Sequence, residues 1–356
     1  MKIGIYDPYL DDLGGGEKYM MSIAKCLAKD NDVSIFWNNR RDLDNLSNRF
    51  AIDLSNVSLV SNIFSPKTNI IKRLLETRKY DVIIFLSDGS IPLVLAKKLF
   101  IHIQQPLKTE KNILTKLKVS RVDRVFCNSY YSKSYIDKQM GVASTVLYPP
   151  IKINSKNKIK QDIILHVGRF RPKDSATGIS DYKKQSVMVN TFKEMIKSGL
   201  KDWKFILAVS IRKGEEGIFE KFRSTAIGYP IEFLVNKTND ELWDVYSMAK
   251  IYWHATGFGE DLIKHPEYAE HFGISTVEAM GAGVVPVVVN AGGQKEIVEN
   301  GKNGFLWDTF SDLTAKTISL INNDRLMKKM SNEAVIRSRY FSGDRFCKEV
   351  MNIIEI

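Results

Sequence analysis

The chain has 356 residues, of which 44% are hydrophobic and 26% are charged, a composition typical of globular proteins rather than disordered or fibrous ones. The length predicts two domains of ordinary size. No run of about 18 apolar residues and no leader with a small-residue cleavage site is present, so we expect neither a membrane span nor export.

The formal charge of +11 is unevenly spread along the chain. Residues 1–150 hold 22 Lys and Arg against 15 Asp and Glu, and the stretch from Lys67 to Lys138 is the most basic. One interpretation is a surface that meets anionic lipid headgroups or an acidic acceptor. The other is a solvated, lysine-rich face without a partner.

The three cysteines, Cys26, Cys127 and Cys347, are far apart and show no metal-ligand spacing. We therefore expect isolated, buried side chains in a reducing compartment, with the cytoplasm as the default location.

Short apolar runs alternate with longer stretches of helical period along the whole chain. Continuous Val and Ile runs indicate strands covered on both faces, as in parallel sheets flanked by helices. The pattern predicts an α/β fold with two doubly wound units. The expected strands are residues 2–6, 33–37, 82–86, 100–103, 124–128 and 145–148, then 162–168, 203–209, 231–235, 251–255 and 284–289.

The junction between the two units falls at residues 149–160, where Pro149 and Pro150 precede a stretch rich in lysine and asparagine. This composition is typical of a linker. A cleft between two such units is the default place for a ligand.

A glycine-rich turn follows the first expected strand, because Gly14, Gly15 and Gly16 precede a helical stretch. Glycines let the backbone approach a ligand, and a helix N-terminus presents N–H groups to negative charge. The alternative is a tight turn that only lets the helix pack on the sheet.

In the second unit, the strand 162–168 is followed by Arg169, and Lys183 and Lys184 come at the start of the next expected helix. A guanidinium and an ammonium at the carboxyl end of a strand can neutralise a diphosphate. The alternative is a solvent-facing arginine and a lysine-rich helix start.

Residues 270–283 read EHFGISTVEAMGAG and are expected to be a turn followed by a helix. The turn at Phe272 and Gly273 would expose the backbone N–H groups of Ile274, Ser275 and Thr276, which suits a phosphate.

Two carboxylates, Glu270 and Glu278, enclose this turn and helix start. Beside a bound anion, a carboxylate is best used to accept hydrogen bonds from hydroxyl groups. A nucleotide sugar has hydroxyls at both ends and a diphosphate between them, which fits the spacing.

The segment Glu270-HFGISTV-Glu278 resembles the E-x7-E motif of retaining glycosyltransferases with the GT-B fold, in glycosyltransferase family 4 (glycosyl transferases group 1). The following AMGAGVVPVVVNAGGQKEIVENGKNGFLW, the VGR with a later lysine, and the N-terminal GGGE are also similar to that family. The resemblance is strong over residues 250–307 and loose over 30–90.

The resemblance implies two Rossmann-like domains that face each other across a cleft. Residues 1–155 would form the acceptor domain, residues 156–340 the nucleotide-sugar domain, and residues 341–356 a helix that crosses back to the first domain.

The resemblance also implies roles for individual residues. Glu278 would hold the ribose hydroxyls and Glu270 those of the donor sugar. Arg169 and Lys184 would stabilise the departing diphosphate, with Lys184 preferred over Lys183 because it directly precedes Gln185. The remaining donor contacts would be Gly15, Gly16, Phe272, Gly273, Ile274 and Ser275.

His102, in FIHIQQP, resembles a histidine that lies beside the reacting sugar in some family members. A lone histidine after an apolar run is also often a structural residue, so both interpretations stay open.

The expected reaction is transfer with retention from a nucleotide sugar, GDP-mannose or a UDP-sugar, to a glycan or lipid-linked acceptor, without a metal or other cofactor. Two D-x-D pairs, Asp30 with Asp32 and Asp42 with Asp44, lie in expected polar connections and are not assigned to a metal. The histidines at 254, 265 and 271 lack a helix-spaced ligand pair.

Two other classes of function are compatible with the sequence. One is a nucleotide-sugar epimerase of the same fold. The other is a non-catalytic basic protein that binds membranes or polyanions, and its binding should weaken steeply with salt.

Overall fold

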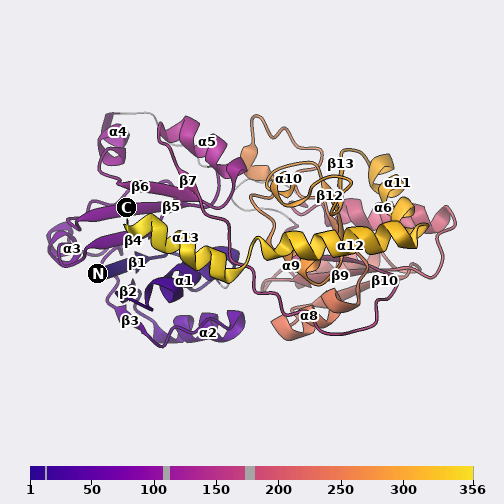
Figure 1. Cartoon of the computed structure of the whole chain (residues 1–356), viewed down its shortest axis with the longest axis horizontal. Coiled ribbons are helices and arrows are strands. Elements are labelled where there is room, and N and C mark those ends of the chain that lie inside the picture. The colour runs from indigo at the N-terminus through magenta and orange to yellow at the C-terminus, as the bar shows by residue number, and fades with distance from the viewer. Residues whose placement is uncertain (13, 107–112, 173–180, 356) are drawn as a thin grey trace. The chain divides into compact units, whose positions relative to one another are not determined.

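The structure is a computed structural model that describes residues 1–12, 14–106, 113–172 and 181–355 (Figure 1). The chain divides into two compact units. The first contains Met1–Pro150 together with Gly343–Ile356, and the second contains Ile151–Ser342. The two units are described separately below.

The first unit is built on a seven-stranded sheet whose paired strands are all parallel, in the order β3-β2-β1-β4-β5-β6-β7. The Val and Ile runs occupy its buried centre, and every residue of VIIFL in β4 is buried. The strands are β1 (Lys2–Tyr6), β2 (Asp32–Phe36), β3 (Val57–Val60), β4 (Val82–Leu86), β5 (Lys98–Ile103), β6 (Arg124–Cys127) and β7 (Thr145–Val146).

The second unit has a six-stranded parallel sheet in the order β10-β9-β8-β11-β12-β13. Its core includes large aromatic side chains of the sheet itself, among them Trp253 and Trp307, both fully buried. The strands are β8 (Ile163–Arg169), β9 (Lys204–Ser210), β10 (Ile231–Val235), β11 (Ile251–His254), β12 (Val285–Val289) and β13 (Phe305–Trp307).

Helices lie between most strands that are consecutive in the chain, as is usual for parallel sheets, whereas the segment 87–97 between β4 and β5 contains no helix. In the first unit they are α1 (Gly15–Leu27), α2 (Arg40–Phe50), α3 (Ile70–Thr77), α4 (Ile113–Val119), α5 (Tyr130–Met140) and α13 (Gly343–Glu355). In the second unit they are α6 (Gln185–Lys197), α7 (Glu216–Ser224), α8 (Asn239–Met248), the 3₁₀ turn η1 (Pro266–Tyr268), α9 (Ile274–Gly281), α10 (Gln294–Ile297), α11 (Phe310–Ile321) and α12 (Asp324–Arg339). Within the described ranges, none of these helices is both long and apolar enough to cross a membrane.

The α/β fold with two doubly wound parallel sheets is confirmed, and each of the eleven expected strands has a counterpart. Two strands were not predicted, β3 and β13. They have four and three residues, and each pairs with only one neighbour at the edge of its sheet. Short edge strands carry little of the apolar signal on which the prediction depends.

The expectation of three isolated cysteines is wrong for two of them. Helix α13 packs on α1 in the first unit, and Cys26 and Cys347 form a disulfide between these helices, across a sequence separation of 321 residues. Cys127 is a free, buried thiol. The pairing was not visible in the sequence because it depends on the return of the C-terminal helix to the first unit.

Candidate functional site

The strand order of each sheet changes direction beside its first strand. In the second unit β8 lies between β9 and β11, so the connections leave to opposite sides at this point. Ligands of open parallel sheets bind outside the carboxyl ends of the strands at such a switch point. Arg169 ends β8 and His254 ends β11, which places both residues at this edge.

The turn before α9 is fixed by a glycine pair from another segment. The N–H of Gly293 donates to the carbonyl of Glu270 at 2.8 Å. A Cβ atom on Gly292 would lie only 2.2 Å from the same carbonyl oxygen, so a side chain there would displace the turn. Gly273 has φ 117°, in the left-handed region that favours glycine, and is the N-cap of α9. The backbone of residues 270–273 is therefore held against the helix start.

Glu270 accepts hydrogen bonds from two basic side chains on one oxygen. Lys183 Nζ lies 2.6 Å and His254 Nε2 lies 3.1 Å from Glu270 Oε2. The Lys183 and Glu270 side chains are 16% and 21% exposed, so the pair is only partly screened by water. Burial raises the pKa of Glu270, but Lys183 and His254 outweigh it and hold the pKa well below its ordinary value. Glu270 is an ionised hydrogen-bond acceptor.

The neighbouring lysine makes a separate ion pair. Lys184 is the N-cap of α6 with φ 54°, and its Nζ contacts Glu260 Oε1. From the sequence, Lys184 was expected to be the phosphate-binding lysine. The structure instead brings Lys183 to a glutamate of the E-x7-E motif, which the choice from sequence did not anticipate.

His254 and His166 form a buried layer next to Glu270. Burial lowers the pKa of His166 to about 3 and also lowers that of His254, so both rings are neutral. His166 Nδ1 donates to the Trp253 carbonyl at 3.0 Å. With His254 neutral, the proton on Nε2 points to Glu270. The position of His254 at the end of a buried strand is the one signal that could have identified it from sequence.

Two tyrosines hold the side chains of α9. The Tyr246 hydroxyl donates to Glu278 Oε2 at 3.2 Å, and the Tyr252 hydroxyl lies 2.7 Å from Ser275 Oγ. Both tyrosines are buried, and burial raises their pKa values, so they remain protonated donors. Neither was predicted as a site residue. Tyrosines within apolar stretches give no sequence signal that separates them from the core.

The other predicted residues of this unit lie at the same edge. Phe272 is 3% exposed and packs its ring edge against Phe341 at 5.4 Å. Ile274 is the first residue of α9, and the partly exposed Arg169 is the last residue of β8. The structure thus brings together the turn, the helix start, Glu270 and Lys183.

The glycine turn of the first unit leads directly into α1, whose first residues are Gly15 and Gly16. The N–H of Gly14 donates to Glu17 Oε2 at 2.7 Å, so Glu17 caps the helix start. A Cβ on Gly16 would lie 2.5 Å from Gln104 Oε1. Close packing between α1 and the residue after β5 is one reason for glycine at this position.

His102 is fully buried near the end of β5. Its ring stacks between Tyr19 and Phe126, with centroid distances of 4.3 Å and 4.7 Å. His102 Nδ1 donates to the Phe126 carbonyl at 3.1 Å, and Nε2 has no hydrogen-bond partner among the described residues. Burial lowers the pKa of His102 to about 3. The ring is therefore neutral, with one nitrogen left as an acceptor.

We expect Glu17 to make the first unit less stable as the pH rises. Burial raises the pKa of Glu17 to about 8, and nearby Asp7, whose own pKa burial raises to about 7, adds to the effect. The folded state then binds more protons than the unfolded state between pH about 4.5 and 8, so stability falls through this window. Glu17→Gln keeps the oxygen that caps Gly14 and removes the titration.

The measurement is urea unfolding followed by circular dichroism at pH 5.5 and 7.5. From pH 5.5 to pH 7.5 the free energy of unfolding should fall by about 1–3 kcal/mol more in the wild type than in Glu17→Gln. If the free energy of unfolding changed equally with pH in the two proteins, the raised pKa of Glu17 would be contradicted.

One of the two D-x-D pairs has structural partners. Asp42 and Asp44 lie in α2 rather than in a connection, where Asp42 accepts from Trp37 Nε1 at 2.8 Å and Asp44 pairs with Arg40 at 2.9 Å. Among the residues that the structure describes, no three His, Cys, Asp or Glu side chains gather in a way that could hold a metal ion.

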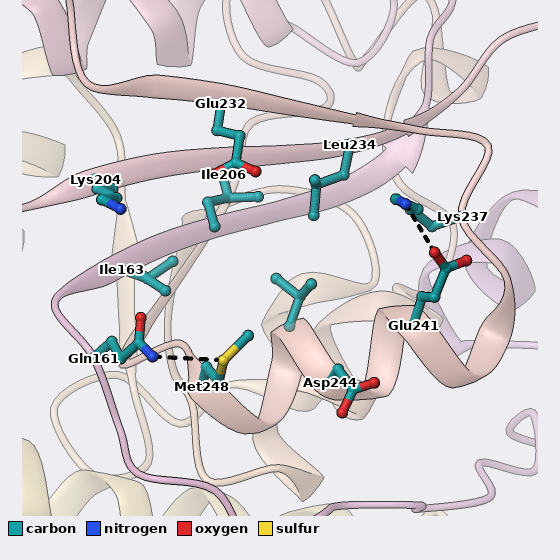
Figure 2. A pocket seen from close by; sticks show the side chains of 11 residues that line it. Gln161, Ile163, Lys204, Ile206, Glu232, Leu234, Lys237, Glu241, Asp244 and Met248 are labelled. Atoms are coloured by element: carbon teal, nitrogen blue, oxygen red, sulfur yellow. Dashed lines mark hydrogen bonds and ion pairs between the residues drawn. The ribbon is translucent and has the colours of Figure 1, made fainter.

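A separate pocket of about 320 Å³ lies between α8 and the face of β8, β9 and β10 (Figure 2). Apolar residues such as Ile163, Ile206 and Leu234 line it, and the Lys237–Glu241 ion pair stands at its side (Figure 2). It includes neither glutamate of the E-x7-E motif. We therefore place the candidate site at the α9 turn and not in this pocket.

Comparison with known proteins identifies the class to which this chain belongs. Residues 150–337 match the family described as glycosyl transferases group 1, and the chain belongs to this family. The matched region contains the whole candidate site of the second unit.

Curated relatives include a GDP-Man:Man(3)GlcNAc(2)-PP-Dol alpha-1,2-mannosyltransferase from Dictyostelium discoideum, 24% identical over 61% of this chain and 43% of that protein. The human protein of the same description is 26% identical over 65% of this chain and 48% of its own length. The matches thus span less than half of these two relatives.

Solved structures support the fold along the whole chain. Anabaena HepE in complex with UDP has a TM-score of 0.74 at 19% identity, with 100% of both chains covered. A glycosyltransferase from Rickettsia africae has a TM-score of 0.73 at 14% identity, covering 99% of this chain and 97% of that one. The fold is GT-B, with two Rossmann-like units.

Proposed function

We propose that the protein is a retaining glycosyltransferase that moves a sugar from GDP-mannose or a UDP-sugar to a hydroxyl of a glycan or lipid-linked acceptor. The observation that carries this proposal is the α9 turn, where backbone N–H groups at a helix start lie between Glu270 and Glu278, with Lys183 bonded to Glu270. The names of the mannosyltransferase relatives and of the UDP complex of HepE agree with such a donor.

Each part of this site has a role in binding the donor. The N–H groups of Ile274 and Ser275 would hold a phosphate at the start of α9. Glu278, oriented by Tyr246, would accept from the ribose hydroxyls, and ionised Glu270 would accept from the donor sugar.

In the transfer step, the acceptor oxygen bonds to the anomeric carbon on the face from which the diphosphate leaves. The bond between the anomeric carbon and the phosphate oxygen breaks, and an oxygen of the leaving diphosphate takes the acceptor proton. Negative charge builds on that diphosphate, and preorganised cations and N–H groups stabilise it. We assign the cations to Arg169 and Lys183. His102 is assigned no contact in this step, because its ring is fully buried and its Nε2 has no exposed surface.

The proposal needs no metal ion, because the chain's own cations neutralise the diphosphate. It also needs no carboxylate nucleophile. Glu270 is tied to Lys183 and His254 on one oxygen, a setting that suits recognition of hydroxyls rather than attack on carbon.

The test is a thermal-shift panel with UDP- and GDP-sugars. A donor at about ten times its Kd should stabilise the folded protein by about 1.4 kcal/mol, which raises the Tm by about 3–5 °C. Glu278→Ala should abolish the shift, whereas Glu241→Ala, at the start of α8 and outside the candidate site, should leave it unchanged. No shift with any nucleotide sugar would refute the donor site.

A further inference from the structure

Helix α3 of the first unit turns large apolar side chains towards solvent. Ile70, Ile71 and Leu75 are 51%, 63% and 57% exposed, and Thr77 is the helix's only buried residue. Helices at the surface of a globular protein usually turn their apolar side chains inward. Ile71 and Leu75 are four positions apart, so they lie on the same side of the helix, and both are more than half exposed. Helix α3 itself lies at the left edge of the first unit (Figure 1).

Two further exposed leucines lie near the end of α3. The N–H of Leu95 donates to Thr77 Oγ1 at 3.0 Å, which ties the segment 91–97 to the end of the helix. In this segment Leu93 and Leu95 are 41% and 45% exposed. We call Ile70, Ile71, Leu75, Leu93 and Leu95 the α3 surface.

Exposed basic side chains lie within α3 and beside it in the sequence. Lys67, Lys72 and Arg78 are exposed, and none of them forms an ion pair within the described part of the chain. Two nearby acidic residues form ion pairs with other lysines: Glu76 with Lys79 at 2.8 Å and Asp81 with Lys97 at 2.6 Å. The surface therefore combines apolar side chains with uncompensated positive charge.

We propose that the α3 surface docks on a membrane that contains anionic lipids. Lysines next to exposed Ile and Leu suit an interface where the cations meet headgroups while the apolar side chains enter the acyl boundary. A soluble polyanion would use the cations but leave the apolar residues without a role. This inference does not depend on the proposed donor site, which lies in the other unit.

The experiment is cosedimentation of the full chain with vesicles at about 0.1 M salt. Vesicles of phosphatidylcholine with about a third phosphatidylglycerol should bind it, and pure phosphatidylcholine should bind it far less. Lys67→Gln with Lys72→Gln should weaken binding about 25-fold, since each lysine contributes about fivefold. Ile71→Ser with Leu75→Ser should weaken it at least about tenfold.

Matched controls come from exposed residues of the second unit. Ile227→Ser, at a site 79% exposed, and Lys201→Gln with Lys213→Gln should bind vesicles as the wild type does. The α3 variants should keep the wild-type circular dichroism spectrum and the nucleotide-sugar thermal shift. Loss of vesicle binding alone then separates this proposal from that of the donor site.

Three results would overturn the proposal. The first is no binding to the anionic vesicles. The second is equal weakening by the α3 and control variants. The third is binding to dextran sulfate as strong as to vesicles, with no effect of the Ile71→Ser and Leu75→Ser changes, which would identify a soluble polyanion as the partner.

Discussion

Lys183→Ala is expected to lower the kcat of sugar transfer by about 10²–10³-fold, while Lys184→Ala lowers it by less than about tenfold. Lys183 Nζ lies 2.6 Å from Glu270, whereas Lys184 contacts Glu260 in the loop after β11. A cation that faces the leaving diphosphate stabilises charge that exists only in the transition state, so its removal should act on kcat. The lysine beside the E-x7-E motif is the better candidate for this role.

The two variants are compared in single-turnover assays with the donor identified by thermal shift. Lys183→Arg should recover part of the rate because it keeps the positive charge. Removal of Lys183 leaves Glu270 with one ionic partner fewer, so circular dichroism is used to check that Lys183→Ala still folds. A larger loss in Lys184→Ala than in Lys183→Ala would restore the assignment made from sequence.

Strands could be predicted from the sequence where their apolar signal is strong. Runs such as VIIFL in β4 and VPVVV in β12 are buried at every position, so their composition alone indicates central strands of a parallel sheet. β13 has only three residues, and its first two are only partly buried. Pairing with a single neighbour defines such a strand, and a sequence does not show that pairing.

The candidate site was predictable only where a local motif carries it. Residues 270–278 read as a turn, a helix start and two carboxylates, and the structure forms that turn and helix. The partners of Glu270 come from distant segments, and the choice between Lys183 and Lys184 depends on the backbone at the start of α6, where φ of Lys184 is 54°. The backbone conformation decides which of the two adjacent lysines reaches Glu270. Two consecutive lysines look alike in a sequence, so this choice could not be predicted.

Glu270→Gln is expected to lower kcat/KM for transfer by about 10²–10³-fold and to leave binding of the sugar-free nucleoside diphosphate within about threefold of wild type. The change keeps the size of the side chain but removes the charge that Lys183 and His254 hold in place. Hydrogen bonds from sugar hydroxyls to a carboxylate are stronger than those to an amide, so the loss should concern the sugar end of the donor.

Glu260→Gln is the matched control, because it removes the charge from the parallel ion pair with Lys184 in the same loop. We expect its kcat/KM to stay within about fivefold of wild type, since this pair lies outside the E-x7-E motif and we assign it no contact with the donor. Lys183 and His254 hold the pKa of Glu270 well below its ordinary value despite burial, so protonation of Glu270 should not limit the wild-type rate between pH 5 and 8. Equal losses in Glu270→Gln and Glu260→Gln would show that the loop needs both ion pairs for its structure and that Glu270 has no separate contact with the sugar.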